Sequence, residues 1–276
     1  MHDDAREGIV AGVVVRPVVR VRGGTAIPRD DAIADEVPVA FVIDDAPFAV
    51  MLASPTHLED FAAGFALTEG LIDHVDELRF QGITQQLEGI EVRASLPPQR
   101  RERLAQRQRS LPGRSGCGLC GAVALEQAVR SPAPVAGGPR IAASALHRAL
   151  EALPSHQAMN YATGAVHAAA FAAPDGTLRI VREDIGRHNA LDKLVGAIAR
   201  QGIDPASGFA VVTSRASYEM AMKAASAGIG LLAAVSAPTA LAVSLARRCN
   251  LTLVGFARAD GHAVYTHPGR LHEDGA

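Results

Sequence analysis

The fold of this 276-residue chain is decided around one polar stretch, Arg182-Glu183-Asp184-Ile185-Gly186-Arg187-His188-Asn189-Ala190-Leu191-Asp192-Lys193. An apolar strand is expected over residues 177–181, just before this stretch. A helix with apolar residues on one stripe is expected over 187–200. The same order, an apolar run followed by a helical pattern, recurs downstream. Alternation of this kind predicts an α/β fold with a mostly parallel sheet covered by helices on both faces.

The other elements of the C-terminal half follow from the same patterns. Strand 166–172 should form a hairpin with strand 177–181 across Pro174-Asp175-Gly176. Further strands are expected over 209–213, 231–235 and 251–256, and further helices over 144–153, 216–227 and 238–247. Ser144 is the expected N-cap of the first of these helices.

The first third of the chain is predicted to be a smaller, β-rich α+β unit. Its one helix, over residues 57–72, should be capped by Thr56. Strands are expected over 10–21, 37–43, 48–52, 80–87 and 90–96. A Pro- and Ser-containing stretch, 131–139, resembles a linker, so we expect two domains, 1–135 and 136–276, the first ending in the loop region of Cys117 and Cys120.

Bulk composition excludes several classes of protein. A formal charge of −2 and 4% aromatic residues with no Trp argue against a nucleic-acid binder and a polybasic membrane anchor. We expect no transmembrane helix, since no apolar stretch reaches 18 residues, and no secretory signal at the N-terminus. Three cysteines, two of them close together, indicate a reactive or metal-binding pair in a reducing compartment, so cytoplasmic localisation is expected.

The close pair of cysteines lies in Gly116-Cys117-Gly118-Leu119-Cys120-Gly121. A structural zinc site would need four ligands, and a second Cys pair is lacking. A thioredoxin-like redox pair should follow a strand, whereas an Arg-rich loop precedes this one. The third hypothesis is sulfur transfer by a thiolate on a glycine-rich loop, favoured by nearby positive charge such as Arg114. The chemistry of the segment alone leaves these alternatives open.

Three junctions after predicted strands carry unusual polarity, around Arg187, Arg215 and Arg258. The carboxyl ends of strands in such a sheet meet at one edge, where helix N-termini and arginines favour phosphate. The alternative is that these groups are helix caps and surface ion pairs. His188 is expected to hydrogen-bond a ligand or support structure, since the residues of a zinc deaminase site are missing around it.

Only two of the 27 basic residues are lysines, Lys193 and Lys223. In a chain that otherwise uses arginine, they are either retained by chance or placed where a compact ammonium group is required.

Four motifs together resemble the FdhD family, the formate dehydrogenase accessory sulfurtransferases. They are Ser115-Gly116-Cys117-Gly118-Leu119-Cys120-Gly121, the stretch 182–193, Ser214-Arg215-Ala216-Ser217-Tyr218-Glu219-Met220, and Ser236-Ala237-Pro238-Thr239-Ala240-Leu241-Ala242-Val243. The resemblance covers roughly residues 37–268, and the second motif is the most specific.

The resemblance implies a function that periodicity does not show. Members of the family take persulfide sulfur from a cysteine desulfurase and pass it to the molybdenum (or tungsten) bis-guanine-dinucleotide cofactor of formate dehydrogenase. It also implies a cytidine-deaminase-like C-terminal fold without zinc chemistry, and a homodimer. The family's persulfide-bearing residue matches Cys117, with Cys120 as its partner. Its cofactor-binding segment matches Phe256, Ala257, Arg258, Ala259, Asp260 and Gly261.

We therefore expect the cofactor's phosphates to contact Arg187, Arg215 and Arg258, with help from Lys193 or Lys223. The alternative function is a chaperone that delivers the molybdenum cofactor without handling sulfur, with Cys117 and Cys120 docking a partner.

Overall fold

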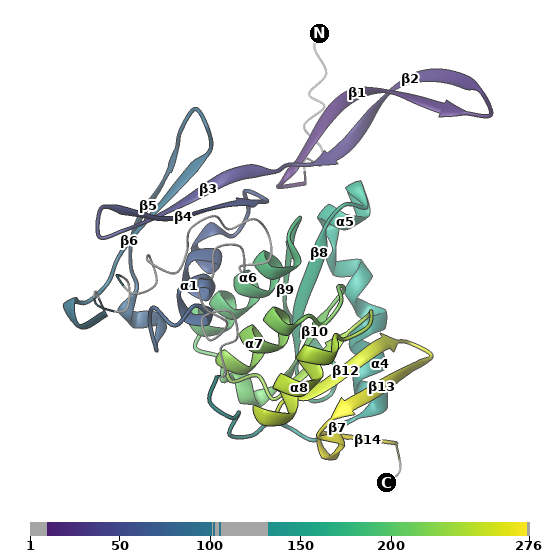
Figure 1. Ribbon diagram of the computed structural model, residues 1–276. Helices are drawn as coiled ribbons and strands as arrows, with labels where there is room; N and C mark the ends of the chain where they lie inside the picture. The colour runs from purple at the N-terminus through teal and green to yellow at the C-terminus, as the bar shows by residue number, and fades with distance from the viewer. Residues whose placement is uncertain (1–9, 101, 103–104, 106–131, 275–276) are drawn as a thin grey trace.

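The C-terminal half is built on a six-stranded mixed sheet in the computed structural model, which describes residues 10–100, 102, 105 and 132–274 (Figure 1). The strand order is β13-β12-β11-β10-β8-β9. The strands are β8 (His167–Ala172), β9 (Leu178–Asp184), β10 (Phe209–Val212), β11 (Leu231–Ala234), β12 (Thr252–Arg258) and β13 (Gly261–Thr266).

The prediction of a mostly parallel sheet is wrong, although the mixed α/β class is confirmed. Only β10–β11 and β11–β12 pair in parallel, while β8 pairs antiparallel with both β9 and β10, and β12 pairs antiparallel with β13. Short turns join β8 to β9 and β12 to β13, and such turns allow only antiparallel pairing. The third antiparallel pair arises because β8 lies between β9 and β10, two strands that run in the same direction.

Helices cover both faces of this sheet, as expected. On one face lie α6 (Arg187–Arg200), α7 (Tyr218–Ser226) and α8 (Ala240–Arg248), which pack on Ala210 and Val212 of β10. The opposite face holds α4 (Ala143–Ala152), which packs near Phe209 and Val211 of the same strand. Alternate residues of β10 therefore serve two separate cores, which requires a run of four buried apolar residues.

Smaller elements complete this half. The helix α5 (Ala158–Thr163) precedes β8, and β7 (Ile141–Ala142) pairs in parallel with β14 (Leu271–His272). None of the helices in the described residues has the length and apolarity needed to cross a membrane.

The N-terminal half contains a four-stranded sheet with the order β4-β3-β6-β5. Its strands are β3 (Val37–Ile43), β4 (Ala46–Ala53), β5 (Arg79–Gln85) and β6 (Ile90–Ser95), and α1 (Leu58–Thr68) covers one face. Phe61 and Phe65 of α1 meet the ring of Phe41 at centroid distances of 5.1 and 5.2 Å. This aromatic cluster is the buried side of the helix expected over 57–72, which ends at Thr68.

The helix α1 also packs closely on α6, which belongs to the other half of the chain. A Cβ atom added to Gly64 would lie 1.7 Å from the carbonyl oxygen of Asp192, and one added to Gly196 would lie 1.8 Å from that of Asp60. Glycine is therefore required at both positions, because it alone lets the two backbones approach this closely. The division into domains 1–135 and 136–276 stays a prediction.

Two predicted helix caps are wrong. The residue before α1 is His57, in a left-handed conformation with φ of 51°, and Thr56 instead accepts a hydrogen bond from Lys193. Ser144 lies inside α4 and its hydroxyl donates to Asp274 at 2.6 Å. In both cases a partner distant in the sequence uses the hydroxyl. The side chains of Ser217 and Thr239 cap α7 and α8.

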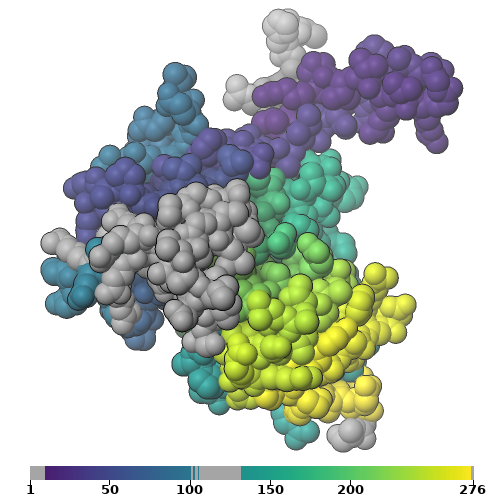
Figure 2. All heavy atoms as spheres, viewed as in Figure 1, coloured from purple at the N-terminus to yellow at the C-terminus, as the bar shows by residue number. Residues whose placement is uncertain are grey.

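A two-stranded ribbon of β1 (Val13–Arg22) and β2 (Thr25–Ala34) extends away from both halves (Figures 1 and 2). The first strand was predicted from its valines. The second was missed, because Pro28, Asp30 and Asp31 are unusual in strands.

Candidate functional site

The three predicted arginine junctions lie along one edge of the C-terminal sheet. β9, β10, β11 and β12 all run in the same direction, because β8 is antiparallel to both of its neighbours. Their carboxyl ends therefore share an edge. The backbone links the neighbouring segments there: Ser236 donates to the carbonyl of Ser214, and Phe256 donates to the carbonyl of Ser236. The predicted convergence is confirmed at the level of the sheet edge.

Arg187 and His188 begin α6 at one end of this edge. The N-cap of α6 is Gly186, which offers no side chain, whereas Ser217 and Thr239 cap the other two helices that begin here. In addition, Nε of Arg187 is buried and makes no hydrogen bond. An uncapped helix start beside an unsatisfied guanidinium nitrogen is suited to an anion with several acceptor oxygens.

The segment Phe256, Ala257, Arg258, Ala259, Asp260 and Gly261 forms the end of β12 and its turn into β13. The pairing of these strands is irregular between Gly255 and Arg258, and Phe256 takes a positive φ of 51°. The Phe256 side chain is nevertheless 49% exposed. A large aromatic residue held in a left-handed conformation at the surface is unusual enough to indicate a functional role.

Arg215 lies between these two ends and is exposed, in the loop that joins β10 to α7. The ends of β12 and β9 are separated by four strand spacings, on the order of 20 Å. One phosphate group cannot bridge such a distance. The three arginines therefore form an extended site along the edge and not a single pocket.

The two lysines lie elsewhere, in a seam between α1, α6 and α7. The Lys193 side chain is 0% exposed, and its ammonium group lies 2.6 Å from Oδ2 of Asp184 and 2.9 Å from the carbonyl oxygen of Ser54. Burial lowers the pKa of Lys193, and Asp184 opposes this effect. The expectation that Lys193 contacts a phosphate is wrong, because its donors are used inside the protein.

Lys223 has a similar environment on α7. It donates to both carboxylate oxygens of Asp192, at 2.8 and 2.9 Å, and to Thr68 of α1 at 3.0 Å. Glu69 lies 3.5 Å away. Burial raises the pKa of Asp192, and the charge of Lys223 opposes the shift. Both lysines therefore join α1 and its flanking residues to the C-terminal half.

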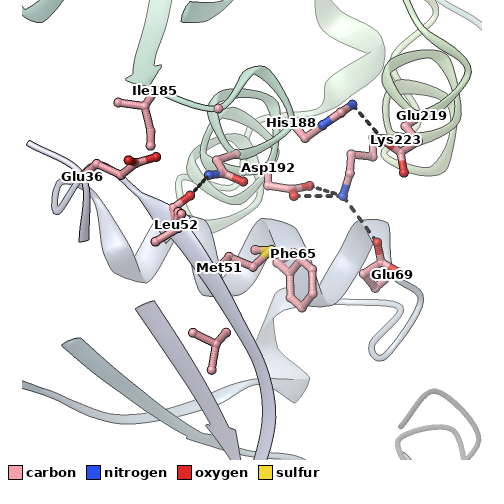
Figure 3. Close-up of a pocket in the computed structure, with 13 residues that line it drawn as sticks. Glu36, Met51, Leu52, Phe65, Glu69, Ile185, His188, Asp192, Glu219 and Lys223 are labelled. Carbon is pink, nitrogen blue, oxygen red and sulfur yellow. Dashed lines mark hydrogen bonds and ion pairs between the residues drawn. The ribbon is translucent and has the colours of Figure 1, made fainter. Parts of the chain in front are cut away.

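A cavity of about 470 Å³ opens beside this seam (Figure 3). Its wall includes Met51, Phe65, His188 and the ion pair of Lys223 with Asp192. The remaining lining residues are Glu36, Val50, Leu52, Glu69, Ile185, Gly186, Asn189 and Glu219. Of the predicted site residues that the structure describes, His188 and Lys223 line this cavity.

His188 and Glu219 face each other across the cavity wall. Nε2 of His188 lies 2.9 Å from Oε2 of Glu219, an ion-pair distance, although the alignment is not that of a hydrogen bond. On the neighbouring strand, burial lowers the pKa of His167, and the positive charges of Arg187 and His188 lower it further. The start of α6 therefore resists additional positive charge, which again favours an anionic ligand.

Cys117 and Cys120 lie outside the described residues. The third cysteine, Cys249, is buried at the end of α8 and donates to the carbonyl of Pro132 at 3.4 Å. Within residues 10–100 and 132–274, His, Cys, Asp and Glu side chains form no group of three that could hold a metal ion.

The residues that the sequence reasoning missed are those that face the N-terminal half. Asn189 donates to the carbonyl of Leu52 and to Asp184, and Asp192 accepts from Thr68. These residues belong to the same motif as Arg187 and His188, so the motif has two roles. The first half of the motif lies at the sheet edge, and the second half fixes α6 against α1. The helical spacing of Asn189 and Asp192 could have indicated a shared face, but not its partners.

Comparison with known proteins gives a family. The family model described as FdhD/NarQ matches residues 34–272. The chain is 53% identical over 271 residues to a protein named sulfur carrier protein FdhD from Xanthomonas euvesicatoria pv. vesicatoria, covering 98% of this chain and 96% of that protein. A protein of the same name from Bordetella bronchiseptica is 50% identical over 256 residues, covering 92% and 93%.

A solved structure shares the fold. It is the crystal structure of a proposed formate dehydrogenase accessory protein from Desulfotalea psychrophila, with a TM-score of 0.74 and 23% sequence identity. The match covers 94% of this chain and 99% of that chain.

Proposed function

This chain belongs to the FdhD/NarQ family, and on that premise we propose that it is a sulfurtransferase that serves formate dehydrogenase. In this proposal the thiolate of Cys117 attacks the terminal sulfur of a persulfide on a cysteine desulfurase. The sulfur–sulfur bond of the donor breaks, its thiolate leaves, and a persulfide forms on Cys117 without any external oxidant. In the delivery step the thiolate of Cys120 attacks the inner sulfur of the Cys117 persulfide, so the sulfur–sulfur bond breaks and a disulfide forms between Cys117 and Cys120. The terminal sulfur leaves as hydrosulfide for the molybdenum bis(molybdopterin guanine dinucleotide) cofactor, and a cellular thiol reductant restores both thiols.

The observation that supports the cofactor part of the proposal is the set of hydrogen-bond donors along the sheet edge. The uncapped start of α6, the unsatisfied Nε of Arg187 and the exposed arginines 215 and 258 all supply donors suited to phosphate. The distance along the edge, on the order of 20 Å, suits a ligand with two nucleotide arms better than a mononucleotide. Phe256 offers an exposed ring on which a purine base can stack.

The sulfur step is tested by mass spectrometry of the intact protein after incubation with a cysteine desulfurase and cysteine. We expect a gain of about 32 Da, one sulfur atom, on the peptide that contains Cys117. The gain should disappear in Cys117→Ala and on reduction. No gain on either Cys117 or Cys120 would remove the proposal.

The same variant separates the alternative, a chaperone that delivers the cofactor without sulfur. In a cell that makes only Cys117→Ala, a sulfurtransferase would leave formate dehydrogenase loaded with cofactor but inactive. A chaperone would leave it active.

The cofactor site is tested separately with guanosine diphosphate as the probe in calorimetry. Arg258→Ala should weaken binding, because a guanidinium–phosphate pair is lost. Arg179→Ala is the matched control, since Arg179 is an exposed arginine near the start of β9, at the opposite edge of the sheet. Unchanged affinity in Arg258→Ala would exclude Arg258 from the site.

Further parts of the proposal come from the family alone. They are a homodimer, transfer in the cytoplasm without nucleic-acid or membrane partners, and a cytidine-deaminase-like C-terminal fold without a resident metal. The proposed cytidine-deaminase-like fold agrees with the mixed sheet covered by helices on both faces.

A further inference from the structure

The β1–β2 ribbon has two chemically different faces. Residues directly opposite each other in an antiparallel pair share a face, and the register pairs Val13 with Ala34 and Arg22 with Thr25. One face is therefore apolar apart from one carboxylate, and consists of Val13, Val15, Pro17, Val19, Val21, Ala26, Pro28, Asp30, Ala32 and Ala34. The other carries the charges, with Val14, Arg16, Val18, Arg20, Arg22, Thr25, Ile27, Arg29, Asp31 and Ile33.

Away from the base of the ribbon, where Val13, Ala32 and Ala34 are half-buried, the described residues leave the apolar face uncovered. The side chains of Val15, Val19 and Val21 are between 61% and 67% exposed, and the ribbon extends away from the rest of the molecule (Figure 2). An isolated two-stranded ribbon is at best marginally stable in water. A continuous apolar face of this length on such a ribbon indicates a contact with another molecule.

A second exposed apolar surface lies on the N-terminal sheet. The side chains of Val50 and Leu52 on β4 are 60% and 57% exposed. The register places Val50 opposite Ala40 and Leu52 opposite Pro38 on β3, whereas Val39 and Phe41 are buried toward α1. Pro38, Ala40, Val50 and Leu52, which we call the β3–β4 patch, lie on the face that α1 leaves open. Val50 and Leu52 also border the cavity.

We infer that the apolar face of the ribbon docks on the β3–β4 patch of a second copy of this chain, with each copy giving its ribbon to the other. The inference builds on the homodimer proposed above and assigns its surface. It requires no step of sulfur transfer.

The prolines of the ribbon exclude pairing along its edges. Pro17 and Pro28 lie near the middle of β1 and β2, opposite Asp30 and Val19. A proline inside a two-stranded pair must turn its nitrogen away from the partner strand, because it has no N–H to donate. Each outer edge therefore lacks a donor where an added strand would need one. The ribbon can therefore contact another molecule through its apolar face.

The buried surface area favours a dimer in which each ribbon contacts the β3–β4 patch of the other copy over one in which the two ribbons contact each other. Strands of 10 residues make a ribbon about 33 Å long and about 10 Å wide, a footprint on the order of 300 Å². A single ribbon–ribbon contact covers two such footprints, near 600 Å² in total, which is typical of crystal packing. Two reciprocal ribbon–body contacts cover about twice that area, close to the roughly 1,200 Å² at which specific interfaces begin.

The distribution of charge also favours docking of the ribbon on the main part of a second copy. Residues 13–34 hold four arginines against two aspartates, whereas the whole chain has a formal charge of −2. Two ribbons would repel each other, while a ribbon and the rest of another copy attract. The charged face stays in water when the apolar face docks.

The first test is the mass of the full chain in solution by analytical ultracentrifugation. We expect a dimer whose dissociation constant rises at least about 100-fold in Val19→Asp with Val21→Asp, because the new carboxylates would be buried without partners. Ile27→Asp is the matched control, being 53% exposed on the charged face of the same ribbon, and should remain a dimer. A monomeric wild-type chain would overturn the homodimer and this inference together. A dimer unaffected by the double variant would overturn only this inference.

The second test identifies the contact and uses substitutions at two exposed positions, Val19 and Leu52. Cys117 and Cys120 are replaced by Ser, and a chain with Val19→Cys is mixed with one carrying Leu52→Cys. We expect a disulfide between the two different chains under mild oxidation. Cross-linking of position 19 only to position 19 would place ribbon on ribbon and overturn the inference, as would the absence of any cross-link.

Discussion

The seam between the two halves and the edge of the C-terminal sheet both contain basic residues, yet the environments of these residues are opposite. In the seam, Lys193 and Lys223 are buried and each faces a carboxylate within 2.9 Å. Along the edge, Arg187 keeps a buried nitrogen without a hydrogen bond, and Arg215 and Arg258 are exposed. The paired cations hold the halves together, and those at the edge, which form no ion pair with the described residues, are available to a ligand.

This difference explains the choice of residue type. A buried site bounded by backbone and carboxylate oxygens suits the compact ammonium of lysine, with three donors around one nitrogen. A site that must grip phosphate oxygens suits the planar guanidinium. Of the two alternatives for the rare lysines, the structure favours placement where a compact ammonium is required.

The largest expected effect is a loss of stability when an ion pair in the seam is broken. Lys193→Met should lower the free energy of unfolding by about 3–5 kcal/mol, because Asp184 would remain buried without its ion partner. Urea unfolding measures the change. Arg215→Met, at the exposed edge, is the control and should stay within about 0.5 kcal/mol of wild type. Equal losses in the two variants would break the distinction between seam and edge.

The next largest expected effect is a loss of stability when the close packing of α1 on α6 is disturbed. Gly64→Ala should destabilise the protein by about 1–3 kcal/mol, since the new methyl group would collide with the backbone of Asp192. Gly261→Ala meets no atom within 4 Å and should leave thermal stability unchanged. If Gly64→Ala is as stable as wild type, the helices do not approach as closely as described.

A substitution at the sheet edge should change the affinity for a ligand and leave the stability of the protein unchanged. Arg187→Met should weaken guanosine diphosphate binding about 10-fold or more, the worth of one hydrogen bond to a charged group. Its melting temperature should stay near that of wild type. Calorimetry with the probe and a thermal melt separate these results, and a variant that melts early but binds normally would assign Arg187 to the seam.

The smallest effect is a pH dependence at His167. Burial, with the charges of Arg187 and His188, lowers the pKa of His167 below its usual 6.5. Between these two values the unfolded chain binds a proton that the folded chain does not, so stability falls as pH falls through this window. His167→Gln should show a shallower loss between pH 7.5 and 5.5 in urea unfolding. A steeper loss in the variant would contradict the direction of the shift.

Sequence patterns predicted most elements but not their pairing. The apolar runs that became β8, β10, β11 and β12 were recognised because burial on both faces requires consecutive apolar residues. The parallel arrangement was over-predicted, because two short turns force antiparallel neighbours. Thr56 and Ser144 were assigned as caps from local preference, but partners distant in the chain claimed their hydroxyls.

The candidate site divides in the same way. Arg187, Arg215 and the segment around Arg258 were placed on one edge from strand direction alone, and the structure confirms that edge. The inward half of the motif, Asn189, Asp192 and Lys193, was not separated from the outward half. Its partners include the carbonyl of Ser54, 139 positions away from Lys193.

The sequence by itself determined where most strands and helices form, which residues are apolar enough to be buried, and the family of the protein. It could do so because these properties depend on neighbouring residues and on short motifs. Only the tertiary structure decided which charges are neutralised and which remain open to a ligand. A carboxylate within 3 Å can come from any element that packs nearby, and packing joins residues whose separation in the chain leaves no local pattern.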